Sequence, residues 1–240
     1  MAVYFISDLH LQPGKPELAE ALFTFVEQQA EDAEELYILG DFFDAWIGDD
    51  EDDPFYLNIE LRLKRWVDNG LAVYFQHGNR DFLVGERFAE ITGLSLLPEV
   101  ARIQLPDREA LVMHGDSLCI DDSEYQQFRA QVRTEAWQQQ ILAMPLDQRR
   151  QIARQLKDQS QSMNAMKAED IMDVNAGEVV SVMSAHNVQT LIHGHTHRPA
   201  VHDLTVNDRS SHRYVLGDWG NLGWFIRADK TGLQLKSFSI

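Results

Sequence analysis

The chain has 240 residues, 44% of them hydrophobic, which is enough to bury a sizeable core in one large domain or in one domain with an insertion. Asp and Glu number 38 against 21 Lys and Arg, so the formal net charge of −17 argues against nucleic acid as a partner. Cys119 is the only cysteine, which excludes an intramolecular disulfide, and no apolar run reaches the roughly 18 residues of a membrane span. We therefore expect a cytoplasmic protein.

Strand-like runs alternate with helical patterns through much of the chain. The predicted strands cover residues 3–6, 36–39, 71–76, 110–114, 190–193 and 213–216. The predicted helices are Glu17–Ala33, Phe55–Asn69 and Asp81–Thr92, and Gly70 and Gly93 stand where a left-handed C-terminal cap belongs. Between the first two helices, the acidic run Asp49–Asp53 is interpreted as a solvated loop. This alternation predicts a layered α/β core.

The pattern changes between Leu118 and Ala185, where helical segments occur without a convincing strand. One predicted helix begins after Asp121-Asp122 and another at Pro145. Toward the end of the chain, turn residues at 207–208 and 229–232 predict antiparallel hairpins. We therefore expect a single domain over residues 1–240 with a helical cap insertion at about residues 120–170.

Short polar blocks follow several of the predicted strands. They are Asp8-Leu9-His10, Gly40-Asp41-Phe42-Phe43-Asp44, Gly78-Asn79-Arg80-Asp81, His114-Gly115-Asp116 and Gly194-His195-Thr196-His197. In layered α/β folds the carboxyl ends of strands meet at one edge of a sheet, so residues distant in sequence can form one site there. A single Asp-x-His is weak evidence because it is usually a turn or a cap. Five blocks in series predict a site for metal ions.

The residue types in these blocks suit divalent metals. Residues two apart in extended chain point to the same side, so Asp8 with His10 and His195 with His197 can each offer two ligands together. Glycines such as Gly78 allow the backbone to approach an ion or a phosphate closely. Oxygen and nitrogen donors without thiolate favour Mn²⁺, Fe or Zn²⁺ over a structural cysteine zinc site.

These blocks, in this order, resemble those of the calcineurin-like metallophosphoesterases, whose signatures read D-x-H, G-D-x-x-D, G-N-[HR]-D, a His-Gly pair and G-H-[TS]-H. The resemblance covers residues 8–197 and implies a four-layer αββα sandwich with two metal ions at the strand ends. It implies that Asp8, His10 and His197 hold the first metal. It implies that Asn79, His114 and His195 hold the second, and that Asp41 bridges both.

Other residues of the blocks are interpreted as partners of these ligands. Asp44 and Asp81 would orient the ligands from behind, although a helix N-cap is an equal alternative for Asp81. His77 and His193 are expected either to contact the ligand side chains or to be buried at strand ends. The catalytic residues expected from the resemblance are Asp41, Asn79, Arg80, His114 and His195.

Arg80 departs from the commonest pattern, because many relatives have histidine after the Asn. Histidine can donate a proton to a leaving oxygen, whereas arginine stays protonated and supplies only charge and hydrogen bonds. An enzyme without that acid needs a good leaving group. A pyrophosphate bond, which releases a nucleoside monophosphate, is therefore a more natural target than an alkyl phosphate.

Longer strings resemble the UDP-2,3-diacylglucosamine pyrophosphohydrolases, a family that makes lipid X and UMP in lipid A synthesis. The matching strings lie at residues 38–41, 45–50, 77–82, 171–175 and 192–199. The resemblance implies water attack on the α-phosphate, Mn²⁺ as cofactor at two ions per chain, and a UDP-linked diacylated glucosamine as substrate. It implies substrate contacts by seven residues: Asn79, Arg80, Asp122, Ser160, Asn164, Lys167 and His195. Independently, the spacing of Ser160, Asn164 and Lys167 puts them on one helix face, which could equally be a solvated face.

A diacylated substrate implies a membrane surface as partner. From Ser123 to Lys167 the chain carries seven Lys or Arg against four acids, with Trp137, Ile141 and Leu142 among several apolar residues between them. This composition predicts peripheral binding of the insertion to the cytoplasmic face of the inner membrane, although these apolar residues could also pack the cap or line an acyl-chain groove. No obligate protein partner is inferred.

Two alternatives remain open from the sequence. One is another nucleotide pyrophosphatase or phosphoesterase of the same superfamily, which would have the same metals but no reason for a largely helical insertion. The other is a non-catalytic scaffold, for which a complete set of seven ligands would be unexpected.

Overall fold

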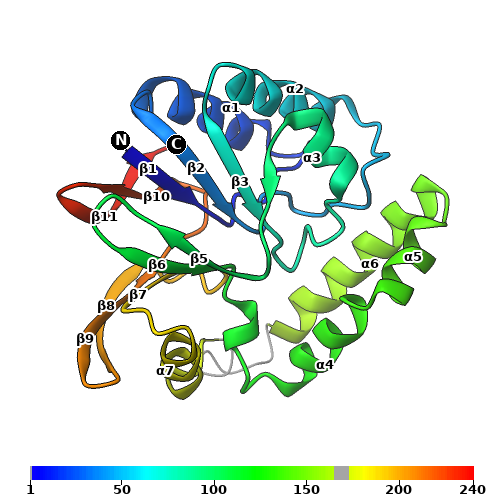
Figure 1. Ribbon diagram of the computed structural model, residues 1–240. Helices are drawn as coiled ribbons and strands as arrows, with labels where there is room; N and C mark the ends of the chain where they lie inside the picture. The colour runs from blue at the N-terminus through cyan, green and yellow to red at the C-terminus, as the bar shows by residue number, and fades with distance from the viewer. Residues whose placement is uncertain (1, 165–172) are drawn as a thin grey trace.

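The computed structural model describes residues 2–164 and 173–240, and within the helix that ends at Asn164 it describes side chains as far as Lys157. Two β-sheets lie face to face, with α1, α2 and α3 over the outer face of one and α7 against the other (Figure 1). Helices α4, α5 and α6 lie to one side of these layers (Figure 1). The predicted α/β sandwich of helix, sheet, sheet and helix layers is confirmed.

The first sheet contains the N-terminal strands and the C-terminal hairpin in the order β11-β10-β1-β2-β3-β4. Its strands are β1 (Ala2–Ile6), β2 (Ala33–Leu39), β3 (Ala72–Gln76), β4 (Ser95–Leu96), β10 (Leu222–Asp229) and β11 (Gly232–Ser239). Strands β1 to β4 are parallel, and β10 is antiparallel to β1. The first three predicted strands and the final hairpin are confirmed.

The second sheet has the order β5-β6-β7-β9-β8. Its strands are β5 (Val100–Gln104), β6 (Glu109–Met113), β7 (Thr190–His193), β8 (Ala200–Val206) and β9 (Arg209–Val215). Strands β6, β7 and β9 are parallel, so their carboxyl ends share an edge. The turn between β8 and β9 has positive φ at Asn207 and Asp208, which these residue types tolerate and which confirms the predicted hairpin.

The helices over the first sheet are α1 (Pro16–Thr24), α2 (Pro54–Asp68) and α3 (Glu86–Thr92). The prediction of one helix over Glu17–Ala33 was wrong at its end, because α1 passes into a wide π-helical turn, η1 (Phe25–Gln29), and Ala33 begins β2. The predicted start of α3 at Asp81 was also wrong. Its N-cap is Gly85, and the buried Asp81 binds loop backbone instead. Gly93 adopts φ +80° at the end of α3, as expected.

Alternating side chains of the central strands fill two different cores. Tyr4 and Ile6 of β1 pack with the helices over the first sheet, whereas Val3 and Phe5 lie in the core between the two sheets. The second sheet packs its other face on α7 through a third cluster that includes Met183. Burial on both faces fixes the register of these strands, and the register fixes where their ends lie.

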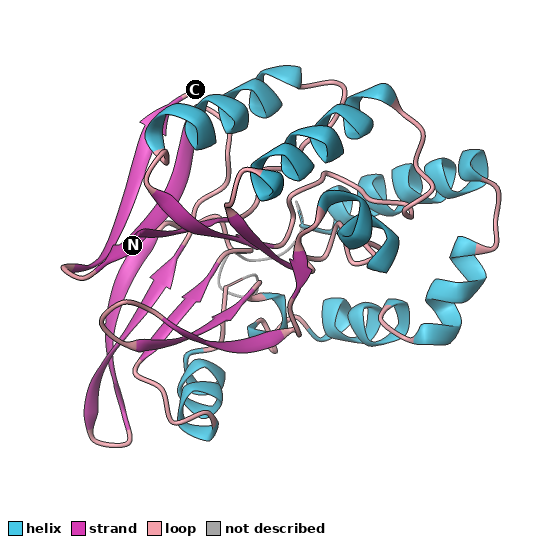
Figure 2. Cartoon of the chain, turned by 45° about the horizontal axis from the view of Figure 1, so that its top comes forward, coloured by secondary structure: helices cyan, strands magenta, loops and turns pink. Residues whose placement is uncertain are grey.

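The helical insertion begins with η2 (Asp116–Leu118) and contains α4 (Ser123–Val132), α5 (Glu135–Leu142) and α6 (Leu146–Asn164), followed by α7 (Ala176–Ala185). Asp122 caps α4 by accepting a hydrogen bond from the Tyr125 amide at 3.1 Å, which confirms the start predicted there. Figure 2 shows α4, α5 and α6 to one side of the sheets. In the described parts of the chain, no helix is long and apolar enough to cross a membrane.

Candidate metal centre and adjoining pocket

The five polar blocks come together where parallel strands of both sheets end. Asp8, Asp41 and Asn79 follow β1, β2 and β3 of the first sheet, while His114 and His195 follow β6 and β7 of the second. The amide of Asp8 donates to the Gly40 carbonyl at 3.1 Å, and the amide of Gly194 donates to the His114 carbonyl at 2.8 Å. Neighbouring loops are thus tied to each other by backbone hydrogen bonds.

The predicted ligands have an unusual backbone conformation. Eight non-glycine residues in the described chain have positive φ, and five of them are Asp8, His10, Asp41, His195 and His197. A left-handed conformation costs a residue with a Cβ about 1–2 kcal/mol. Strain of this kind persists where the surrounding structure enforces it, and it is concentrated here at the predicted ligands.

Two glycines let these loops approach one another. A Cβ on Gly78 would lie 2.2 Å from both the amide nitrogen and Oδ1 of Asp41. A Cβ on Gly194 would lie 2.3 Å from Oδ2 of Asp8 and 2.2 Å from Oγ of Ser7. Any side chain at either position would displace a predicted ligand, so the close approach expected of these glycines is present.

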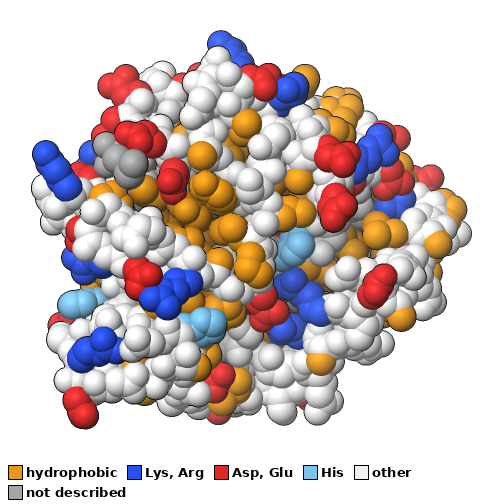
Figure 3. Space-filling view, in the orientation of Figure 1, with side chains coloured by type: hydrophobic (Ala, Val, Ile, Leu, Met, Phe, Trp, Pro, Cys, Tyr) orange, Lys and Arg blue, Asp and Glu red, His pale blue; other side chains and the backbone are white. Residues whose placement is uncertain are grey.

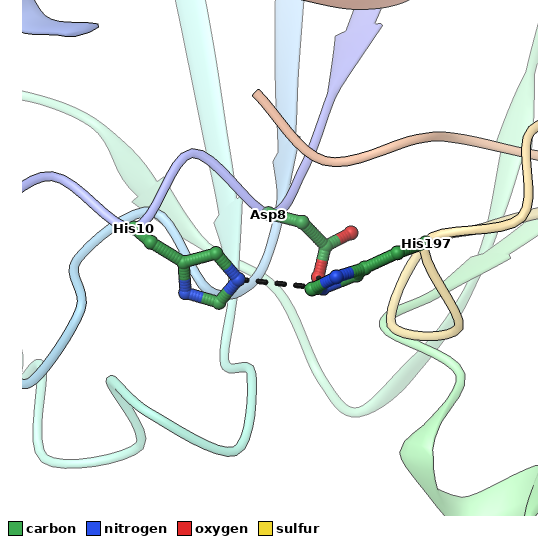
Figure 4. A group of neighbouring side chains, drawn as sticks. All are labelled: Asp8, His10 and His197. Carbon is green, nitrogen blue, oxygen red and sulfur yellow. Dashed lines mark hydrogen bonds and ion pairs between the residues drawn. The ribbon is translucent and has the colours of Figure 1, made fainter. Parts of the chain in front are cut away.

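Asp8, His10 and His197 form one group of potential ligands (Figure 4). Nε2 of His10 lies 3.3 Å from Nε2 of His197, and Nε2 of His197 lies 3.4 Å from Oδ1 of Asp8. Oδ2 of Asp8 accepts from the Ser7 hydroxyl at 2.5 Å and from the His195 amide at 3.0 Å. Oδ1 is buried and has no hydrogen-bond partner among the described residues, although it points toward the two imidazoles.

Asn79, His114 and His195 form a second group. Oδ1 of Asn79 lies 3.0 Å from Nε2 of His114 and 2.9 Å from Nδ1 of His195. Nδ1 of His114 is 2.8 Å from the Leu39 carbonyl, an acceptor that requires a proton on this nitrogen. In the neutral imidazole the lone pair of Nε2 then faces the Asn79 oxygen. Two acceptors in contact need a proton or a cation between them.

Asp41 lies between the two groups. Its Oδ1 is 3.7 Å from Nε2 of His114, and its Oδ2 is 4.0 Å from Nδ1 of His10. Oδ1 also accepts a hydrogen bond from the Arg80 amide at 2.8 Å. Asp8, Asp41 and His114 together offer ligand atoms within 4.8 Å of one another, so the two groups lie side by side with Asp8 and Asp41 between them. The position of Asp41 suits a ligand shared by two ions.

Asp81 holds the loops that carry Asp41 and Asn79. Its buried carboxylate accepts from the Phe42 amide and the Gly78 amide at 2.7 Å each, and from the amides of Asp41 and Phe43 at 3.3 Å each. These bonds support its predicted role behind the ligands. The alternative of a helix N-cap was wrong, because α3 begins five residues later.

Burial sets the protonation of the candidate ligands. It lowers the pKa of His10 and the pKa of His195 to about 4 each. Both imidazoles are therefore neutral at pH 7 and can offer a nitrogen lone pair to a metal ion. Burial lowers the pKa of His197 too, but the Asp8 carboxylate outweighs this and raises it to about 9. Burial raises the pKa of Asp41, and nearby carboxylates act in the same direction. Buried carboxylates, an unpartnered oxygen and the neutral imidazoles of His10 and His195 fit a site for divalent cations.

A pocket of about 230 Å³ opens beside Asn79 and Arg80, between the loops and the insertion. Apolar side chains from the loop after β2, from the segment before α3 and from α4, α5 and α6 form most of its wall: Trp46, Ile47, Phe82, Leu83, Phe128, Trp137, Ile141, Ile152, Ala153 and Leu156. Asp44 and Lys157 also line the pocket, and Nζ of Lys157 donates to the Asp44 carboxylate at 2.6 Å. The pocket therefore places an apolar wall next to Asn79 and Arg80 of the candidate metal centre.

Two arginines of the insertion form ion pairs with acidic residues of the loop after β2. Arg149 is 3% exposed and donates to the Ile47 carbonyl and to Oδ1 of Asp50, both at 2.7 Å. Arg150 is paired with Glu51 and Asp52. The interpretation of Asp49–Asp53 as a solvated loop was therefore wrong for the buried Glu51, whereas Asp50 and Asp52 are exposed. The expectation that the basic residues of the insertion face a membrane was wrong for Arg149, which is buried against Asp50.

Only some of the remaining predicted substrate-binding residues lie within the described part of the chain. Arg80 lines the pocket, and the buried Asp122 caps α4. Ser160 and Asn164 belong to α6, but their side chains lie outside the described residues, as does the whole of Lys167. Their contacts with substrate remain predictions.

Sequence reasoning missed residues whose side-chain contacts are set by the fold. Ser7 binds Asp8, and the buried Asp116 accepts from Tyr125 at 2.7 Å and from Arg129 at 2.8 Å. Asp116 stood within a recognised block, so its chemistry was visible but its partners were not. Tyr125 and Lys157 lie in helices with no local pattern that marks them.

Comparisons with known proteins agree with this geometry. The profile of the calcineurin-like phosphoesterase family matches residues 1–199. The chain is 52% identical to a UDP-2,3-diacylglucosamine hydrolase of Cellvibrio japonicus and 46% identical to one of Salmonella paratyphi B, in each case over the full length of both chains. The solved structure of an archaeal phosphodiesterase aligns over the full length of both chains with a TM-score of 0.51 at 11% identity, which shows a shared fold alone.

Proposed function

The chain belongs to the calcineurin-like phosphoesterase family, and from this premise we propose that it hydrolyses the pyrophosphate bond of UDP-2,3-diacylglucosamine. The products are UMP and 2,3-diacylglucosamine 1-phosphate (lipid X), which places the reaction in lipid A synthesis. Two full-length relatives with this activity in their names support the proposal. The observation that carries it is the continuity of a polar metal-type site with an apolar pocket beside Asn79 and Arg80.

The two groups of ligands would each hold one divalent cation. Asp8, His10 and His197 would hold the first, and Asn79, His114 and His195 the second, with Asp41 shared. Bound metals would supply an activated water and positive charge at the reacting phosphorus. We propose Mn²⁺ because the imidazole nitrogens favour it over Mg²⁺.

The chain's own side chains bind and orient the pyrophosphate. Arg80 lines the pocket next to Asn79, and its guanidinium stays protonated at any working pH. It therefore stabilises the charge that develops on the phosphate oxygens, without serving as a proton donor. With attack at the α-phosphate, the leaving group is the phosphate monoester of lipid X, which needs little help from an acid and agrees with arginine at this position. Water then attacks the α-phosphate on the uridine side.

The apolar pocket would receive an acyl chain of the substrate. Trp46, Leu83 and Phe82 come from the same loops as the candidate ligands, while Ile141 and Ile152 come from the insertion. A lipid chain seated there would lie between the two parts of the molecule, with its head group at the candidate metal centre. Ser160 and Asn164, near the end of α6, would add contacts to the sugar and phosphate, as would Lys167, which lies outside the described residues.

A substrate with two acyl chains resides in a bilayer, so we propose peripheral association with the cytoplasmic face of the inner membrane. Leu142 of α5 is 42% exposed and Phe128 of α4 is 38% exposed. Figure 3 shows scattered apolar side chains on the surface of the molecule among acidic and basic ones. A few exposed apolar side chains are enough for reversible attachment at a lipid interface.

Vesicle co-sedimentation tests this attachment with a matched pair of variants. Leu142→Glu should reduce the bound fraction, whereas Leu61→Glu on α2, where Leu61 is 68% exposed, should not. Equal binding by both variants would refute docking through the insertion.

Product analysis tests the proposed reaction. The purified protein, Mn²⁺ and UDP-2,3-diacylglucosamine in detergent micelles should give UMP and lipid X, and excess EDTA should stop turnover. In water enriched in ¹⁸O, the label should appear in UMP and be visible by ³¹P NMR. Label in lipid X would contradict attack on the α-phosphate. Turnover of other nucleotide pyrophosphates with equal efficiency would favour a less specific pyrophosphatase.

A further inference from the structure

Tyr125 stands at the junction of the candidate metal centre and the pocket. It lies in the first turn of α4, lines the pocket beside Asn79 and Arg80, and stacks its ring on the imidazole of His195. The two ring centroids are 5.9 Å apart, with 27° between the planes. A residue of the insertion therefore touches a predicted metal ligand directly.

The hydroxyl of Tyr125 is held by a buried charge. It donates to Oδ2 of Asp116 at 2.7 Å, and Arg129 donates to the same oxygen at 2.8 Å. Asp116 is 1% exposed and forms an ion pair with Arg129. Gln126 adds a 2.8 Å bond to the Asp116 carbonyl. With its hydroxyl anchored and its backbone in a helix, the Tyr125 ring has little freedom to turn.

The orientation of the His195 imidazole is set by the side chains packed around it. Its backbone has φ +68°, and its Nδ1 lies 2.9 Å from Asn79. The ring of His114 meets His195 edge-on, with centroids 5.0 Å apart and 67° between the planes. Tyr125 stacks with it in a nearly parallel arrangement. The imidazole is thus confined by one ring from the second sheet and one from the insertion.

We propose that Tyr125 is a positioning residue for His195, with Asp116 as its anchor. The ring of Tyr125 fixes the plane of the imidazole, and the insertion thereby contributes to the geometry of the metal centre as well as to the pocket. The inference rests on the proposed two-metal function. A partner that orients a metal ligand typically accounts for roughly 10–100-fold in metal affinity or activity.

Two substitutions separate the ring from the hydroxyl. Tyr125→Leu removes the stacked ring and should lower kcat roughly 10–100-fold with less than about threefold change in KM. Tyr125→Phe keeps the ring and should retain most of kcat. Phe128→Leu, one turn along the same helix in the pocket wall, should instead raise KM. Gln127→Ala on the exposed side of α4 is the control without effect.

Metal binding provides a readout that does not depend on turnover. Titration of the apo protein with Mn²⁺ should show roughly 10–100-fold weaker binding at one of two sites in Tyr125→Leu and near-normal binding in Tyr125→Phe. The visible absorption of the Co²⁺-loaded protein should change in the first variant only. Thermal unfolding checks that both variants are folded.

The outcomes distinguish this inference from the proposed function. Unchanged metal affinity and Co²⁺ spectrum in folded Tyr125→Leu would overturn the positioning role, as would an effect on KM alone. Absence of turnover by the wild type would instead count against the proposed reaction, and the metal titration would still decide the role of Tyr125.

Discussion

The loops of the candidate metal centre and the helices of the insertion are built by different means. The loops are buried, tied together by Asp81 and by close glycine contacts, and hold Asp8 and Asp41 at positive φ. The insertion is attached by charged side chains, such as Arg149 to Asp50 and Lys157 to Asp44, and by apolar side chains such as Ile141 around a pocket. The loops hold the candidate ligand atoms in fixed positions, whereas the insertion encloses an apolar pocket.

This difference follows from what each region would have to do. Phosphoryl chemistry requires ligands and charges fixed to within a fraction of an ångström, so strain in the loops is compensated by many buried hydrogen bonds. Acyl chains are recognised by apolar area and shape, which place fewer demands on individual atoms. Substitutions in the loops should therefore affect kcat and metal binding, and substitutions in the insertion should affect KM and stability.

The largest effect is expected at the shared ligand. Asp41→Ala should lower kcat more than roughly 1000-fold, because both metal sites lose a ligand. Metal analysis of the purified variant should show loss of bound Mn²⁺. Asp44→Ala is the matched control in the same loop and should retain its metal. Near-normal turnover by Asp41→Ala would refute the two-metal assignment.

Arg80→Ala should separate charge stabilisation from metal binding. We expect kcat to fall roughly 100-fold while metal content stays normal, since one preorganised charge in an active site is typically responsible for this much. Steady-state kinetics and metal analysis together check this. Arg87→Ala, an exposed arginine on α3, serves as the control. Loss of metal from Arg80→Ala would assign it a structural role, and a change confined to KM would also contradict the prediction.

Filling the pocket should affect substrate binding more than chemistry. Ala153 lies in the pocket wall on α6, and Ala153→Trp would occupy space assigned to an acyl chain. We expect KM for the diacylated substrate to rise roughly tenfold or more, since losing two or three buried methylene groups costs about 2 kcal/mol. Ala153→Ser is the size-matched control. An unchanged KM in folded Ala153→Trp would remove the pocket from substrate recognition.

The smallest effects should separate two adjacent arginines of the insertion. Arg149→Met leaves Asp50 and two carbonyls without a buried partner and should lower the free energy of unfolding by about 3 kcal/mol. Arg150→Met removes an exposed pair with Asp52 and a pair with Glu51, which keeps its hydrogen bonds from the Asp52 and Asp53 amides, and it should cost less than Arg149→Met. Denaturant unfolding measures both. Equal costs would show that the insertion is not fastened through Arg149.

The sandwich and the candidate ligands could be predicted because both are constrained locally. Buried strands such as β7 show as apolar runs, and Asp8, His10 and Gly78 occupy strand ends where few residue types allow metal chemistry. Helix ends were predictable where glycine acts as a cap, as at Gly93.

What could not be predicted depends on contacts between distant segments. Asp81 looked like a helix cap because its carboxylate suits either role, and only the fold shows that it binds the loop after β2. Arg149 resembled a membrane-facing charge because Asp50 lies 99 residues away in the chain. The stacking of Tyr125 on His195 has no counterpart in any local pattern.

The division between a catalytic centre and a lipid pocket is tested most directly by one comparison of substrates. Wild-type kcat/KM with Mn²⁺ would be measured for UDP-2,3-diacylglucosamine and for UDP-glucosamine without acyl chains. We predict at least roughly 100-fold preference for the diacylated substrate, because burial of a few methylene groups supplies about 3 kcal/mol. Equal efficiency on the two compounds, or no turnover of the diacylated one, would contradict the account.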